Sequence, residues 1–252
     1  MIDNNLVEKW RQVDLEKPPY IFPGDEQLIR GRKIDPDIKS YEEYVARLGE
    51  VKEFPNKLHV GLIPVPYVGN LETAKFFILT ANPGLGTTNY KGEYDDSKYR
   101  KQLIINLRQE NFDEYPFMSL NIEFAWLGGF IYWERKFSSI INQLLENQIT
   151  YDNALRLISN KVACVELVPY HSTKGCGISN LESTKMFKEF VHQVLKPKAQ
   201  KGEIDIVVIR KAVDWGLEND KHTIVFPANQ ARSSSLGIDN EGGKRILELL
   251  IN

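Results

Sequence analysis

The chain of 252 residues has only two cysteines, Cys164 and Cys176, and it lacks a long apolar run. Two cysteines are too few for a disulfide framework, and their spacing does not fit a zinc site. The longest apolar stretch, residues 124–133, is interrupted by two glycines and is far shorter than the roughly 20 residues of a membrane helix. The polar amino terminus also lacks the apolar segment of a signal peptide. We therefore expect a soluble protein of the reducing cytoplasm, without a membrane span.

An excess of charge of either sign is also missing. The 32 basic and 34 acidic residues give a net charge of -2, so no overall field attracts the protein to nucleic acid or anionic lipid, and any such binding must be local. Hydrophobic residues make up 42% of the chain, which is enough for a sizeable core, and the length suits one elaborated domain. We predict a single α/β domain, with residues 1–66 as an amino-terminal elaboration and residues 67–252 as the core.

Short apolar runs alternate with amphipathic segments along the chain, which indicates βαβ crossovers. Residues 76–80 form such a run and end in Asn-Pro-Gly, a turn sequence. Ser40 followed by Glu43 is typical of a capping box that begins a helix. The expected fold is a three-layer αβα arrangement around a central, mostly parallel four-stranded sheet. Strands are predicted at residues 76–80, 162–168, 204–209 and 222–226, and helices at residues 6–15, 40–48, 95–109, 130–145, 183–195 and 243–251.

Loops rich in polar residues, proline or glycine follow three of the four predicted strands. They comprise residues 81–86, 169–173 and 227–235. In parallel α/β sheets, ligands bind beyond the carboxyl ends of the strands, so these loops are expected to converge on one site. We expect one cleft there, lined by Asn82, Glu166, Tyr170, His171 and Asn229.

Several of these features also have a purely structural interpretation. Asn, Pro and Gly are ordinary turn residues, and the loop after Thr80 has neither the lysine of a Walker A motif nor the third glycine of a Rossmann fingerprint. His171 is either a satisfied polar residue at a strand end or a ligand contact. Glu166 lies either at an exposed strand end or in a functional position, because an unpaired buried carboxylate is costly. The basic run 196–201 is interpreted as a solvated connection, and the remaining histidines lack metal-ligand spacing, so neither a metal nor a cofactor is expected.

The strand 76–80 followed by Asn82, Pro83 and Gly84 resembles the first motif of the uracil-DNA glycosylase superfamily, especially its mismatch-specific and single-strand-selective branches. In that family the asparagine positions the water that attacks the sugar, which implies this role for Asn82. Glu166 lies where the family carries a base-reading asparagine, and residues 229–236 lie where its second motif inserts a loop into DNA. The resemblance implies a uracil-DNA-glycosylase-like fold and a DNA N-glycosylase, a hydrolase of DNA repair whose partner is DNA or a nucleotide.

Glu166 and residues 229–232 depart from the motifs of that family. A carboxylate only accepts hydrogen bonds, so an ionised Glu166 suits a base with N–H donors rather than the O4 edge of uracil. The other implied roles are stacking on Tyr90 or Tyr94, contact of His171 with the departing base, and phosphate contacts by Arg232 and the adjacent serines. A non-catalytic nucleotide or nucleic-acid binding module on the same fold is the alternative. The predicted catalytic residues are Asn82 and His171, and the predicted substrate-binding residues are Pro83, Gly84, Tyr90, Tyr94, Glu166, Tyr170, Asn229, Arg232 and Ser233.

Overall fold

A mostly parallel sheet forms the centre of the molecule. The computed structural model describes residues 4–31, 33–34, 38, 40–175, 178, 180–227, 229 and 236–251. Within these residues the central sheet has five strands in the order β3-β5-β4-β6-β7. The strands are β3 (Tyr67–Val68), β4 (Phe76–Thr80), β5 (Val162–Glu166), β6 (Asp205–Val208) and β7 (Thr223–Val225). The α/β class is therefore confirmed.

The four predicted strands are all present in this sheet and run parallel to one another. The prediction of four strands is wrong by one, because β3 pairs antiparallel with β5 at the edge of the sheet. Two residues are too few to show the alternation by which a strand is recognised. The chain leaves β3 through Gly69, whose φ is 101° and where an added Cβ would lie 2.6 Å from the Val162 carbonyl oxygen. Only glycine fits this close approach.

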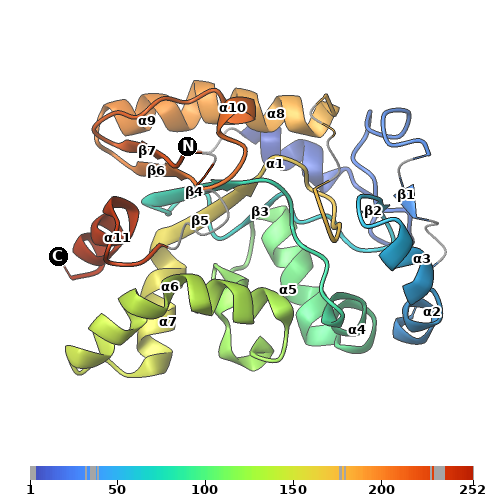
Figure 1. Cartoon of the computed structure of the whole chain (residues 1–252), viewed down its shortest axis with the longest axis horizontal. Helices are drawn as coiled ribbons and strands as arrows, with labels where there is room; N and C mark the ends of the chain where they lie inside the picture. The colour runs from blue at the N-terminus through green and yellow to red at the C-terminus, as the bar shows by residue number, and fades with distance from the viewer. Residues whose placement is uncertain are drawn as a thin grey trace.

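Helices cover both faces of the sheet, as Figure 1 shows. On one face lie α8 (Glu182–Phe190), the π-helical segment η3 (Val191–Leu195) and α9 (Lys196–Gln200). On the other lie α5 (Ser97–Arg108), α6 (Gly128–Glu146) and α7 (Tyr151–Lys161), and α11 (Glu241–Ile251) packs against α6 and α7. Both β4 and β5 are buried along their whole length, because helices shield them on both sides.

The remaining elements are α1 (Asn4–Arg11), β1 (Lys33–Ile34), α2 (Tyr41–Ala46), α3 (Leu48–Glu53), β2 (Leu58–His59), α4 (Thr88–Asp95), η1 (Met118–Leu120), η2 (Ile122–Phe124) and α10 (Ala212–Trp215).

Each predicted helix has a counterpart among these elements, and the predicted cap of α2 is formed by Ser40, whose Oγ accepts from the Glu43 N–H at 3.2 Å. The basic run 196–201 is not a solvated connection, because its first five residues form α9. Pro197, which has no N–H to donate, directly follows the π-helical segment η3, with which α9 is continuous. Within the described residues, no helix is long and apolar enough to cross a membrane.

The amino-terminal segment is attached to the rest of the chain through Asp25. Its buried carboxylate accepts from the Tyr170 hydroxyl at 2.8 Å, from the Ser183 hydroxyl at 2.6 Å and from the Ser183 N–H at 3.2 Å. The N-cap of α8, Leu181, has no side chain able to cap. Asp25 therefore caps this helix from a distant part of the sequence.

We expect Asp25→Ala to lower the free energy of unfolding by about 3 kcal/mol, because it leaves the buried Tyr170 hydroxyl without an acceptor and the first turn of α8 without its cap. Chemical denaturation of the two proteins measures this difference. Tyr170→Phe removes the hydrogen bond to Asp25 and the one accepted from the Phe22 N–H, but keeps the cap of α8, and should cost about 2 kcal/mol. A loss below about 1 kcal/mol for Asp25→Ala would contradict the capping role.

Candidate functional site at the carboxyl ends of β4 and β5

The chain segments that follow β4 and β5 continue side by side beyond the sheet. The Leu167 N–H donates to the Thr80 carbonyl at 3.3 Å, and the Val168 N–H donates to the Ala81 carbonyl at 2.9 Å. Further along, Gly84 forms an isolated parallel bridge with Ser172. The predicted neighbourhood of the Asn-Pro-Gly loop and residues 167–172 is thus present.

Asn82 is half-buried. Within the described residues, only the nitrogen of its side-chain amide is held by hydrogen bonds. Its Nδ2 donates to the Pro83 carbonyl at 2.9 Å and to the Ser172 Oγ at 3.0 Å. The Ser172 hydroxyl in turn donates to the Lys174 carbonyl at 2.7 Å. No described residue donates to Asn82 Oδ1. This oxygen is therefore the acceptor that the amide offers to a ligand or a water.

Glu166 ends β5 opposite Thr80 of β4, and its side chain is 6% exposed. Its Oε1 lies 3.9 Å from Cys164 Sγ, whereas its Oε2 is buried and has no hydrogen-bond partner among the described residues. Burial raises the pKa of Glu166 to about 8, against smaller lowering effects of the Cys164 hydrogen bond and the charge of Arg210. The sequence-based expectation of an ionised carboxylate is therefore corrected: at neutral pH Glu166 is protonated and has one O–H donor.

The first turns of α6 connect the Asn-Pro-Gly loop with Glu166. The Gly128 N–H donates to Thr88 Oγ1 at 3.1 Å, and Thr88 begins α4 directly after the loop. One turn later, burial raises the pKa of Tyr132 to about 12, with the charge of Glu166 acting in the same direction and Arg210 opposing it. Tyr132 on α6 and Arg210 after the end of β6 are therefore within electrostatic range of Glu166.

The predicted site residues do not include Thr88, Tyr132, Ser172 or Arg210, although Ser172 belongs to the predicted loop 169–173. Arg210 could have been predicted from the sequence. It comes two positions after β6, and ligands are expected beyond the carboxyl end of that strand as well. Tyr132 carries no such signal, since its position in an amphipathic helix is typical of an ordinary core residue.

His171 is hydrogen-bonded to the Asn-Pro-Gly loop. Its Nδ1 lies 2.8 Å from the Gly84 carbonyl oxygen, so this nitrogen must carry the proton. The ring is buried, and burial lowers its pKa. Its neighbour across a backbone bridge is His59, whose pKa burial lowers to about 3. These contacts favour the interpretation of His171 as a satisfied polar residue, and its Nδ1 is not open to a departing base.

Tyr90 and Tyr94 belong to the interior. Tyr90 is 1% exposed and stacks on Tyr44 and Tyr94, with ring centroids 4.6 and 6.0 Å away. The Tyr94 hydroxyl donates to the carbonyls of Ile38 and Gly61. The predicted stacking platform is therefore part of a packed aromatic cluster, in which Tyr90 is buried and Tyr94 is half-buried.

Tyr170 and Asn229 do not complete the expected cleft. Tyr170 is fully buried, and its hydroxyl faces Asp25 on the side of the amino-terminal segment. Asn229 lies exposed in a turn. Arg232 and Ser233 lie outside the described residues.

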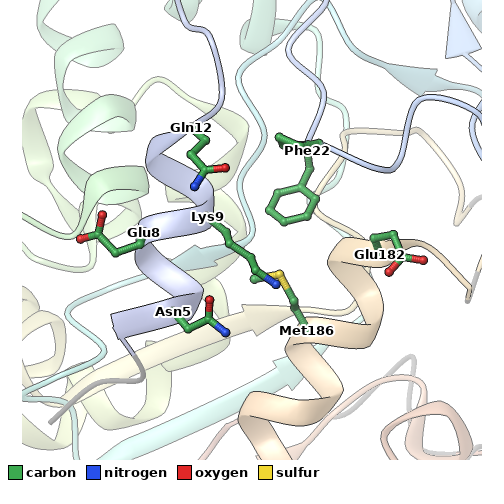
Figure 2. Close-up of a pocket in the computed structure, with 8 residues that line it drawn as sticks. Asn5, Glu8, Lys9, Gln12, Phe22, Glu182 and Met186 are labelled. Carbon is green, nitrogen blue, oxygen red and sulfur yellow. The ribbon is translucent and has the colours of Figure 1, made fainter.

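A cavity of about 340 Å³ lies elsewhere, between α1 and α8 (Figure 2). Phe22 and Met186 supply its apolar surface, and Lys9 extends toward the Met186 sulfur. None of the predicted site residues lines this cavity. Its full lining is Asn5, Glu8, Lys9, Gln12, Phe22, Pro23, Glu182 and Met186. The candidate site at the carboxyl ends of β4 and β5 is therefore separate from this cavity.

Among the described residues there is no group of three or more His, Cys, Asp or Glu side chains that could hold a metal ion. Comparison of the chain with protein-family models, with curated proteins and with solved structures gave no match. The function is therefore inferred from the geometry of the strand ends and from the motif that the sequence carries there.

Proposed function

We propose that the protein is a uracil-DNA-glycosylase-like hydrolase that releases a keto base from DNA between the Asn82 loop and the start of α6. The observation that carries this proposal is the Asn-Pro-Gly loop directly after β4, with the Asn82 amide anchored on Ser172, no described residue donating to its Oδ1, and the buried Glu166 opposite Thr80 at the end of the neighbouring strand. Such an arrangement offers a water-orienting acceptor and a base-reading donor at one edge of the sheet.

Glu166 would read the base through its proton. If the Cys164 thiol donates to Oε1, that oxygen is the acceptor of the carboxyl group and the proton lies on Oε2. Oε2 then donates to a keto oxygen such as O4 of uracil or O6 of hypoxanthine. A protonated carboxyl has one donor and one acceptor, as the amide of asparagine does. Because Oε2 is buried, a base reaches it only after a neighbouring side chain such as Tyr132 moves aside.

The chemistry would be hydrolysis of the glycosidic bond. The oxygen of water forms a bond to the sugar C1′, the bond from C1′ to the base nitrogen breaks, and its electron pair leaves with the base. The departing base then takes up a proton, and the attacking water loses one to the solvent. Asn82 Oδ1 would orient the water, and the O–H of Glu166 would stabilise the negative charge that develops on the keto oxygen. An amide is not a general base, so slow turnover is expected.

The alternative is a binding module on the same fold that recognises a nucleotide or a nucleic-acid end without chemistry. One observation favours it: His171, the residue expected to assist the departing base, has its Nδ1 occupied by the Gly84 carbonyl. Such a module would still use Asn82 and Glu166 as contacts.

Base release from oligonucleotides distinguishes these two functions. We expect release of uracil or hypoxanthine, with a rate that falls as the pH passes about 8, because Glu166 then loses the proton it donates. Single-stranded and duplex substrates that contain uracil, hypoxanthine or xanthine should be tested side by side. Binding without release of any base would leave only the binding module, and absence of both would refute the proposed site.

A further inference from the structure

The cavity between α1 and α8 is a second place where the chain can hold a small molecule. Its volume of about 340 Å³ lies within the roughly 300 to 1,000 Å³ that is typical of ligand-binding sites. No residue of the candidate site at the strand ends lines this cavity. A ligand bound here would therefore belong to a separate site, and its binding does not depend on the proposed function.

The apolar wall of the cavity is held in place from behind. The centroid of the Phe22 ring lies 4.6 Å from that of the Trp10 ring, and the Phe22 N–H donates to the Tyr170 hydroxyl at 3.0 Å. Shortly after Phe22 the chain is anchored by Asp25, which caps α8. Met186 of α8 completes the apolar wall, and Figure 2 shows its side chain and the Phe22 ring in the space between the two helices. The wall is therefore formed before a ligand enters.

Lys9 of α1 supplies the positive charge of the cavity lining. The residue is half-buried, and its side chain crosses the cavity toward the Met186 sulfur (Figure 2). Among the described residues, no side chain forms an ion pair or a hydrogen bond with its ammonium group. A half-buried ammonium has lost part of its water without gaining a counter-ion, so an anionic ligand is favoured at this point.

The two glutamates of the lining do not neutralise Lys9. Glu8 pairs with Arg11 at 2.6 Å, and Glu182 pairs with Lys185 at 2.5 Å. In Figure 2 both carboxylates are directed away from the middle of the cavity. As charges at the rim, they repel a ligand with two negative charges more strongly than a ligand with one.

We propose that this cavity binds a small organic carboxylate with a flat apolar body, which places its single negative charge on Lys9 and its body between Phe22 and Met186. Lys9 is one compact charge, and it matches the one charge of a carboxylate. A phosphate group has close to two charges at neutral pH, and it is disfavoured by the glutamates at the rim. A flat body suits the wall because it can lie against the aromatic ring and the polarizable sulfur.

Three probes with the same apolar body and different charges test this inference. They are 2-naphthoate with one negative charge, 2-naphthalenemethanol with none, and 2-naphthyl phosphate with close to two. We expect 2-naphthoate to bind about tenfold more tightly than the alcohol, because only the acid pairs with Lys9. The phosphate should bind no more tightly than 2-naphthoate. Isothermal titration calorimetry with the full chain measures the three affinities.

Variants of Lys9 and Met186 separate the charge from the apolar contact. Lys9→Met keeps an apolar stem but removes the charge, so it should weaken binding of 2-naphthoate about tenfold, to the level of the alcohol, while Lys9→Arg should retain most of the affinity. Met186→Ala removes apolar surface only and should weaken binding of the acid and of the alcohol by the same factor. Lys101→Met is the matched control, because Lys101 is an exposed cation of α5 outside the cavity lining.

Equal affinities for 2-naphthoate and the alcohol would overturn the inference, and so would equal losses for Lys9→Met and Lys101→Met. In either case Lys9 does not hold an anion. Absence of 2-naphthoate binding at millimolar concentration, or tighter binding of the phosphate, would also count against a carboxylate site. Base release at the candidate site involves none of these residues, so these outcomes leave the proposed function intact.

Discussion

The Glu166→Gln variant should be more stable than the wild-type protein at high pH, whereas at low pH it should have no such advantage. In the wild-type protein Glu166 has a pKa of about 8, compared with 4.5 for an ordinary glutamate. The folded state therefore binds one more proton than the unfolded state between these values, and the stability of the wild type falls as the pH rises through this window. Glutamine is neutral throughout. The difference between the two proteins should grow by on the order of 3 to 5 kcal/mol from pH 4 to pH 9, since one pKa unit corresponds to about 1.4 kcal/mol.

Chemical denaturation at closely spaced pH values measures this difference. Glu93 is also buried, with a pKa raised to about 8, but it is present in both proteins and its contribution cancels in the comparison. Glu203→Gln is a suitable control because this glutamate is exposed; its curve should run parallel to that of the wild type. A difference between Glu166→Gln and wild type that stays constant over the whole range would show that Glu166 is ionised in the folded protein.

Asn82→Ala should reduce base release by at least about 100-fold while changing the affinity for the oligonucleotide by no more than about threefold. The proposal assigns to Asn82 Oδ1 only the attacking water, whereas Glu166 reads the base. Single-turnover release measures the chemical step, and fluorescence anisotropy of a labelled oligonucleotide measures binding. Circular dichroism confirms that the variant is folded.

Ser172→Ala tests how the amide is held. The Ser172 hydroxyl accepts from Asn82 Nδ2 at 3.0 Å, so its removal loosens the amide without deleting it. We expect a smaller loss of release than for Asn82→Ala, on the order of tenfold. If Asn82→Ala releases bases at the wild-type rate, another group orients the water and the assignment of Asn82 is wrong.

The sheet could be predicted from the sequence because β4 and β5 are short apolar runs shielded on both faces. By contrast, α4 escaped prediction because its buried face includes Glu93, which accepts from the Ile63 N–H and pairs with Arg100 at 3.2 Å. A buried polar side chain interrupts the apolar stripe that reveals a helix. Partners distant in the sequence made this position possible, and their contacts are invisible in a local pattern.

The site was predicted in part for a related reason. The rule that ligands bind at strand ends selected Asn82 and Glu166, which depend only on where β4 and β5 stop. The roles given to Tyr90 and Tyr170 required exposed side chains, but residues of the amino-terminal segment, distant in the sequence, pack against both. The protonation of Glu166 likewise follows from tertiary burial, which the sequence does not specify.

The two edges of the sheet have a consequence for the behaviour of the protein at high concentration. An edge strand with a long row of free N–H and C=O groups invites pairing with another chain and aggregation. The edge strand β3 has only two residues and follows Pro64 and Pro66, which have no N–H, and β7 on the opposite edge has three residues and is followed by Pro227. Within the described residues, the buried apolar strands β4 and β5 are thus enclosed by edges too short to template the growth of a fibril.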